Sequence, residues 1–213
     1  MLMRRVSVVL ILCMMAVATY AQPKGFSAVK NSAAFGQALS KANASVQTIS
    51  SDFTQVKNMA LLSEKIKSKG KFNFKKEDKV RIEYTSPYAY LLVMNGNQVM
   101  VKDEQKTSKV NTKNSKMMQS VNRVMMDCMR GTVLSNPDFK TSVFENAQSY
   151  LVSMVPANDA MKKMFKQIDV YMKKGNYEVD RLSMVEQGGD YTDMDFSNTQ
   201  HNVSLNDALF KVK

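Results

Sequence analysis

Alternating apolar and polar residues predict a mostly β structure for the larger, later part of the chain. In Lys71–Lys76, Phe72 and Phe74 fall on one face of an extended segment, and the residues between them are polar. This period of two is typical of a half-buried strand. The same alternation predicts strands at 51–56, 80–85, 90–94, 98–102, 139–144, 150–155, 167–172, 178–185 and 191–196. Asn95-Gly96 separates two of these segments and predicts a tight antiparallel hairpin.

Two segments show helical spacing instead. Apolar residues recur at intervals of three or four through Phe26–Ala44, where Asn31 or Ser32 is a suitable N-cap. A second apolar stripe recurs through Met117–Val133, between the two runs of strands. We therefore predict one domain, mainly β with α, that has an N-terminal helix and a central helical insert.

The first residues have the order of a secretory signal peptide. Met1–Arg5 is short and cationic, Val6–Ala18 is apolar, and small residues precede the expected cleavage site. Cleavage after Ala21 leaves residues 22–213 as a single domain. We expect this domain to be exported to the periplasm in soluble form.

The leader has two other interpretations. A membrane anchor needs about 20 apolar residues, and this run is shorter. A lipoprotein signal would be cleaved before Cys13, but the bulky Leu12 precedes it. After cleavage at the signal-peptide site, Cys128 is the single thiol, so an oxidising compartment provides no internal disulfide.

Composition argues against catalysis. The chain of 213 residues has one His and two Cys, which leaves little material for a zinc site or a catalytic triad. Asp193 and Asp195 share a strand face, but without a neighbouring His we interpret that face as hydrated. We expect no catalytic residue, no metal and no enzyme activity.

The charge is strongly positive. Lys and Arg number 30 against 19 acids, a net charge of +11, which favours acidic partners such as anionic lipid. The lysine-rich stretch around the strand at 71–76 lacks stacking aromatics beside its charges. Together with export, this argues against nucleic acid as a partner.

Five short elements follow one another in a family-like order: Asp52–Gln55, Gly70–Lys76, Val80–Pro87, Leu91–Gly96 and Asp207–Val212. The first is similar to an F-x-Q element that follows a first helix, the next three to successive strands, and the last to a closing strand. In this order they resemble LolA, the periplasmic outer-membrane lipoprotein carrier. The chain departs from the family pattern where Arg-Pro becomes Lys76-Glu77 and where a cavity Trp becomes Ile82. The chain therefore resembles a divergent member of the LolA family.

The resemblance implies an incomplete antiparallel β-barrel whose concave apolar face is closed by a helical lid. LolA-like proteins are periplasmic chaperones that take triacylated lipoproteins from an inner-membrane transporter and pass them to an outer-membrane receptor, without bond chemistry. The implied partners are acylated lipoproteins, the lipoprotein-releasing transporter, and an outer-membrane receptor or the membrane surface. No cofactor is implied, and we expect a monomer.

Alternation and resemblance together give a candidate binding site. The predicted inner face of the cavity comprises Phe72, Phe74, Val80, Ile82, Tyr84, Tyr90, Leu92 and Met94, and the predicted lid comprises Met117, Val121, Val124, Met125 and Met129. Lys76 is predicted to contact carbonyl groups of the lid or of a ligand; the alternative is an exposed strand end. The chain has 18 Met, a flexible residue suited to an adaptable pocket, although Met also fills ordinary cores.

Two other function classes stay open at this stage. A lipoprotein- or lipid-sensing regulatory module would use the same fold, but such proteins usually carry a second domain, for which this chain has little room. An envelope hydrolase is opposed by the scarcity of His, Cys and paired acids.

Overall fold

A curved antiparallel sheet dominates the computed structural model, which describes residues 23–61, 64–114 and 116–212. The predicted leader, residues 1–21, lies outside the described residues. In the described part of the chain, twelve strands form the sheet in the order β1-β8-β9-β10-β11-β12-β2-β3-β4-β5-β6-β7. The strands are β1 (Ser27–Ala28), β2 (Thr48–Asn58), β3 (Lys65–Lys75), β4 (Lys79–Ser86), β5 (Tyr90–Asn95), β6 (Gln98–Lys102), β7 (Thr107–Asn111), β8 (Phe139–Glu145), β9 (Ser149–Pro156), β10 (Phe165–Lys173), β11 (Val179–Glu186) and β12 (Tyr191–His201).

The sheet is not closed. Its edges, β1 and β7, are not paired with each other, and β2 in the middle joins a half built from β8–β12 to a half built from β3–β7. The predicted fold class, an incomplete antiparallel barrel with a helical insert, is confirmed. Alternation located most strands, but it did not predict the exposed edge strand β7 or the two-residue β1.

Three α-helices accompany the sheet in the described segments: α1 (Ser32–Ala44), α2 (Lys116–Arg130) and α3 (Asp159–Lys162). Asn31 caps α1 as predicted, because its side chain accepts a hydrogen bond of 2.9 Å from the Ala34 amide. The helix begins later than predicted, since Ser27 and Ala28 pair with β8. None of the helices in these segments is both long and apolar enough to cross a membrane.

The lid helix α2 ends three residues before the predicted boundary. Gly131 follows it with φ of 72°, a left-handed conformation that commonly terminates helices. Gly131 also lies against α1, where its carbonyl accepts a hydrogen bond of 2.8 Å from Ser40. A side chain at Gly131 would meet the Leu39 carbonyl oxygen at 2.8 Å. The end of α2 is therefore fixed by the close approach of α1.

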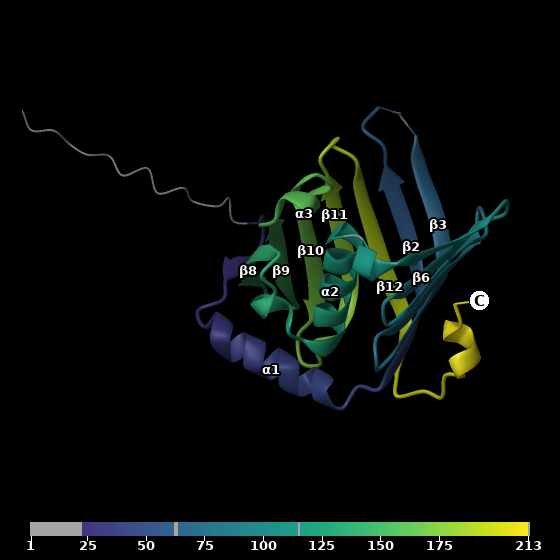
Figure 1. Ribbon diagram of the computed structural model, residues 1–213. Coiled ribbons are helices and arrows are strands. Elements are labelled where there is room, and N and C mark those ends of the chain that lie inside the picture. Colours follow the sequence, from purple (N-terminus) through teal and green to yellow (C-terminus); the bar gives the residue numbers. More distant parts are fainter. Residues whose placement is uncertain (1–22, 62–63, 115, 213) are drawn as a thin grey trace, which may run out of the picture.

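The C-terminal segment corrects one expectation. Asp207–Phe210 forms a 3-10 helix, η3, on the outer side of the sheet and not the predicted closing strand (Figure 1). Phe210 is fully buried in a small core with Val93 and Met100. Both faces of β5 are apolar, so this segment covers the outer face while α2 covers the inner one.

Ion pairs hold the same segment to the sheet. Asp207 pairs with Lys75 at 3.1 Å and with Lys79 at 3.0 Å. Hydrogen bonds from Lys79 and then from Lys75 lower the pKa of the Asp207 carboxyl. The Asn95 side chain also donates to the Phe210 carbonyl at 3.0 Å. The C-terminal segment therefore stiffens the β3–β6 half from outside.

Candidate functional site

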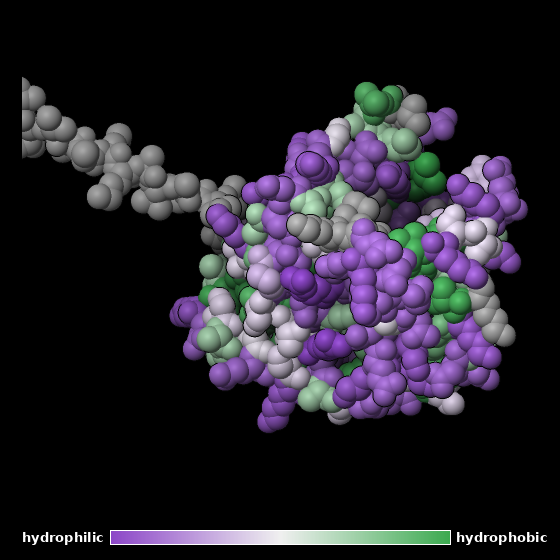
Figure 2. Space-filling view, viewed as in Figure 1, coloured by the Kyte–Doolittle hydropathy of each residue, from purple (hydrophilic) through white to green (hydrophobic). Residues whose placement is uncertain are grey.

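Helix α2 lies inside the curve of the sheet and faces it with an apolar stripe (Figure 1). Val121 and Val124 pack against the core cluster of the β8–β12 half, and Met125 and Met129 pack against that of the β3–β7 half. In Figure 2, hydrophilic side chains cover the outer side of this helix. The helix therefore spans the open side of the curved sheet, where the sequence predicts a lid.

Polar contacts tie α2 to both halves of the sheet. On one side, Arg130 pairs with Asp78 in the β3–β4 turn, and Asn122 donates to the Gly96 carbonyl at 3.4 Å. On the other side, Arg123 pairs with Asp138 at 3.3 Å. The Arg130–Asp78 pair is exposed, and such pairs contribute about 0.2–1 kcal/mol, whereas Asp138 is buried. The helix is therefore held by its buried stripe together with a small number of polar contacts.

The Asn158 side chain adds one more contact between α2 and the β8–β12 half. It donates to Ser120 at 3.3 Å and to Asp138 at 2.7 Å, and it also caps α3 by accepting from the Met161 amide. One amide thus links α2, α3 and the start of β8. This small network anchors the N-terminal part of α2, where Ser120 lies.

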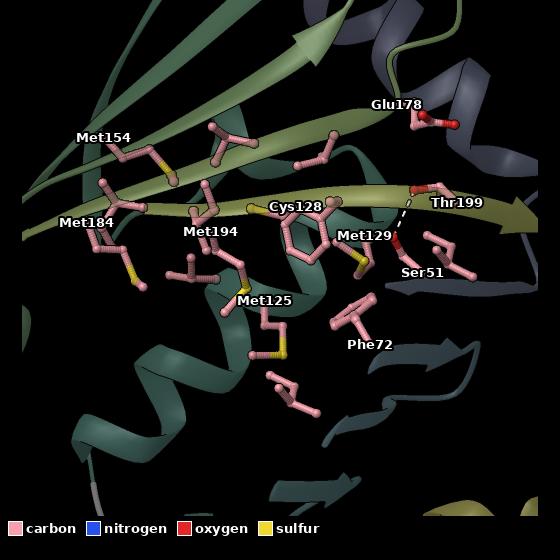
Figure 3. A pocket seen from close by; sticks show the side chains of 18 of the residues that line it. Ser51, Phe72, Met125, Cys128, Met129, Met154, Glu178, Met184, Met194 and Thr199 are labelled. Carbon is pink, nitrogen blue, oxygen red and sulfur yellow. Dashed lines mark hydrogen bonds between the residues drawn. The ribbon is translucent and has the colours of Figure 1, made fainter. Parts of the chain in front are cut away.

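An apolar cavity of about 300 Å³ lies between α2 and the sheet (Figure 3). Sulfur atoms are prominent in its walls. Its sulfur-bearing residues are Met125, Cys128, Met129, Met154, Met161, Met184 and Met194. A wall of unbranched, polarisable side chains can adjust to ligands of different shape. The cavity volume is at the lower end of the range of about 300–1,000 Å³ that is typical of ligand pockets.

Seven of the predicted residues line this cavity. They are Phe72, Ile82 and Tyr84 from the sheet, and Val121, Val124, Met125 and Met129 from α2. The Tyr84 hydroxyl donates to Gln55 at 2.8 Å, and burial raises its pKa to about 12, so it stays neutral. The side chain of Met117, the remaining predicted lid residue, lies outside the described residues.

The other predicted sheet residues do not line the cavity. Phe74, Val80 and Met94 are almost fully buried in one core cluster with Met126 of α2. Leu92 packs against this cluster, and Tyr90 is exposed, with its ring centroid 5.6 Å from that of Tyr84. The structure therefore places these five outside the cavity lining, unlike the prediction. Phe74, Val80, Met94 and Leu92 share the predicted strand face, but Met126 of α2 packs in their cluster.

Lys76 also corrects a prediction. It is exposed, just beyond the end of β3, and its ammonium group donates to the Ala44 carbonyl of α1 at 3.4 Å, not to the lid. The cation that reaches between the lid and the β3–β4 turn is Arg130, on the lid itself. Sequence reasoning missed this pair because Asp78 and Arg130 lie 52 positions apart.

The second half of the cavity wall was missed as well. Residues of β9–β12, including Met154, Ile168, Leu182 and Met194, face α2 across the cavity. Their alternation in the sequence predicts strands but does not indicate which face lines a cavity. The pairing of β12 with β2 brings this half beside the predicted one.

The structure also places the remaining titratable groups. Within the described residues, no three His, Cys, Asp or Glu side chains form a group suited to a metal ion. Asp193 accepts from Ser183 and Asp195 from Arg181, each at 2.6 Å, so both carboxylates are satisfied within the sheet. Glu178 at the cavity wall pairs with Lys173.

Cys128 is expected to react slowly in the folded protein. Burial raises the pKa of its thiol to about 12, against an ordinary value of 9.0. Since the thiolate is the nucleophile, its fraction at pH 8 falls by about a thousandfold. Iodoacetamide should alkylate residues 22–213, in which Cys128 is the sole cysteine, at least about a hundredfold more slowly in buffer than in guanidinium chloride. Equal rates in the two solvents would show that the thiol is accessible.

Comparison with known proteins adds to this geometry. Residues 44–213 match the family described as outer membrane lipoprotein carrier protein LolA. The chain belongs to the LolA family. No curated protein sequence matches it. Among solved structures, it is similar to an uncharacterised conserved protein from Thermus thermophilus, with 9% identity, 84% of this chain and 93% of the other covered, and a TM-score of 0.50.

Two further structures are similar to this LolA-family chain. One is a putative outer membrane lipoprotein-sorting protein domain from Vibrio parahaemolyticus, with 10% identity, coverage of 83% and 94%, and a TM-score of 0.48. The other is a LolA superfamily protein from Nitrosomonas europaea, with 9% identity, coverage of 83% and 97%, and a TM-score of 0.45. At these identities the likeness concerns the fold. The chain is a divergent LolA-family member with the lipoprotein-carrier fold.

Proposed function

We propose that this LolA-family protein shields the acyl chains of lipoproteins and carries them across the periplasm from the inner to the outer membrane. The observation that carries the proposal is the methionine-lined cavity beneath helix α2. Each buried methylene of an acyl chain contributes about 0.8 kcal/mol, so an exposed chain requires an apolar shelter in water. The carrier acts by binding alone, without catalysis.

Loading requires the lid to move. Three acyl chains need more space than a cavity of about 300 Å³ provides, so α2 must withdraw from the sheet. Its stripe then loses contacts with the core, and the acyl chains replace them. Because burial of the acyl chains replaces burial of the α2 stripe, the free energies of the empty and loaded states differ by only a few kcal/mol. This near balance is what a carrier needs in order to accept and release cargo.

The remaining parts of the proposal concern export and partners. Residues 1–21 serve as a signal peptide, and residues 22–213 act as a monomeric domain in the periplasm. An inner-membrane transporter supplies the lipoprotein, and an outer-membrane receptor or the membrane surface receives it. The positive net charge favours contact with acidic surfaces at either step.

Mass spectrometry of the protein purified from its native envelope tests the proposal. We expect an intact mass that begins at Gln22 and a co-purifying acylated protein. In vitro, a tripalmitoylated cysteinyl peptide should bind, and the same peptide without its acyl chains should not. Equal binding of the two peptides would contradict carriage of acyl chains, and an intact mass that includes Met1 would contradict export by cleavage.

A further inference from the structure

The two ends of the cavity differ in polarity. Glu178, Thr199 and Ser51 lie together toward one end, and Met154 and Met184 lie toward the other (Figure 3). His201 also lines the polar end and is exposed, so this end communicates with solvent. An acylated protein has the same polarity, because its chains are apolar and its peptide must continue into water.

A bulge in β12 creates the polar end. Met194 and Phe196 line the cavity, so simple alternation would next bring residues 198 and 200 inward. Instead the pairing with β2 shifts between Ser197 and Gln200, and Thr199 and His201 line the cavity. Bulges of this kind redirect side chains and are frequent near functional sites.

The bulge is held by specific contacts. Asn198 adopts φ of 53°, a left-handed conformation that Asn tolerates, and its side chain donates to Asp52 at 2.9 Å. This hydrogen bond, and then the hydrogen bond from Lys71, lower the pKa of the Asp52 carboxyl. Ser51 donates to the Ser197 carbonyl at 2.9 Å. Contacts between β12 and β2 thus stabilise the inward orientation of Thr199.

Thr199 has a defined hydrogen-bonding role toward the cavity. Its hydroxyl lies 3.0 Å from that of Ser51. The single Ser51 proton already has main-chain carbonyls within reach, those of Ser197 at 2.9 Å and Asp52 at 3.0 Å. Either hydroxyl can donate to the other. When Ser51 donates to the Ser197 carbonyl, Thr199 supplies the proton between the two hydroxyls and keeps free lone pairs. In that arrangement Thr199 can accept a hydrogen bond from a group inside the apolar cavity.

We propose that Ser51 and Thr199 form a head-group subsite, in which Thr199 accepts a hydrogen bond from the amide N–H that joins an acyl chain to the amino terminus of the cargo. This inference rests on the proposed function. The acyl chains then extend toward Met154 and Met184, and the peptide leaves past His201. A diacyl phospholipid has ester linkages without this donor, so Thr199 distinguishes N-acylated peptide from membrane lipid.

Replacement of Thr199 tests the subsite with a matched pair of ligands. The probes are a tripalmitoylated cysteinyl peptide and its N-methyl amide analogue, in which a methyl group replaces the amide hydrogen. The wild-type domain should prefer the first by about three- to tenfold, as expected for one neutral hydrogen bond. T199V should abolish this preference, and T199S should retain it.

The control is T192V, which makes the same exchange at a buried position of β12 that does not line the cavity. It should retain the preference. If T199V also retains the preference, the proposed head-group subsite is contradicted, and the proposed carrier function is not. If the wild type binds neither peptide, the proposed function itself fails.

A photoreactive group tests the direction of the chains independently. Palmitoyl chains with a terminal diazirine should label β9 and β11, near Met154 and Met184, when the bound complex is irradiated. Labelling of β2 near Ser51 by the chain ends would mean that the ligand lies in the opposite direction and would overturn the inference.

Discussion

Linking the lid helix to the β3–β4 turn is expected to abolish uptake of a tripalmitoylated peptide without unfolding the protein. Asp78 and Arg130 form an ion pair between that turn and the end of α2, and both side chains are accessible to reagents. In a C128A background, D78C and R130C can be joined by a short bismaleimide. The link holds α2 over a cavity of about 300 Å³, too small for three chains. Fluorescence-detected peptide binding, before and after linking, measures the effect.

The control pair lies on the same sheet, away from the lid. Arg181 and Asp195 are register partners on β11 and β12 and form an exposed ion pair. R181C and D195C, joined by the same reagent, should leave uptake unchanged, and both linked proteins should keep their unfolding transitions. Full uptake by the protein linked at positions 78 and 130 would show that the lid does not gate the cavity.

Replacing Gly70 with valine is expected to destabilise the domain by at least about 3 kcal/mol. Gly70 on β3 lies between Phe53 on β2 and Tyr84 on β4, and the rings of Phe53 and Tyr84 meet across it at 5.0 Å. A Cβ at Gly70 would stand 2.1 Å from the Glu83 carbonyl oxygen and 2.5 Å from the Phe53 ring. The clash involves backbone and a buried ring, so no flexible side chain can yield. Guanidinium-induced unfolding followed by circular dichroism measures the loss.

Gly188 provides the matched control for this prediction. It lies in the turn between β11 and β12, and an added Cβ would meet nothing within 4 Å. G188V should change the free energy of unfolding by less than about 0.5 kcal/mol. Similar losses for G70V and G188V would mean that the packing at Gly70 is not responsible. Since Tyr84 lines the cavity, G70V should also weaken ligand binding wherever it remains folded.

The local sequence determined most of the secondary structure. Period-two alternation located the long strands, Asn31 and its spacing to the apolar stripe located α1, and Asn95-Gly96 marked the β5–β6 turn. These features depend on neighbouring residues, because strand pleat and helix turn set which side chains share a face. The family-like order of elements was also readable along the chain, and it predicted the open barrel and the lid.

The tertiary structure decided which of these residues form a site. Phe72 and Phe74 have the same pattern and share one core cluster with Met126, yet Phe72 also lines the cavity and Phe74 does not. The difference depends on where α2 rests on the sheet. That position is set by packing between segments far apart in sequence, and strand periodicity carries no information about it.

The local sequence pattern also fails to predict the polar end of the cavity and the C-terminal segment. Alternation along β12 fails at Asn198, because contacts with Asp52 and Ser51 on β2 stabilise a bulge that redirects Thr199. The apolar residues near Phe210 would suit a strand, but the outer face of β5 offers them burial as a short helix. In both cases a contact across more than 100 residues outweighed the local pattern, since burial and hydrogen bonding are settled only when distant segments meet.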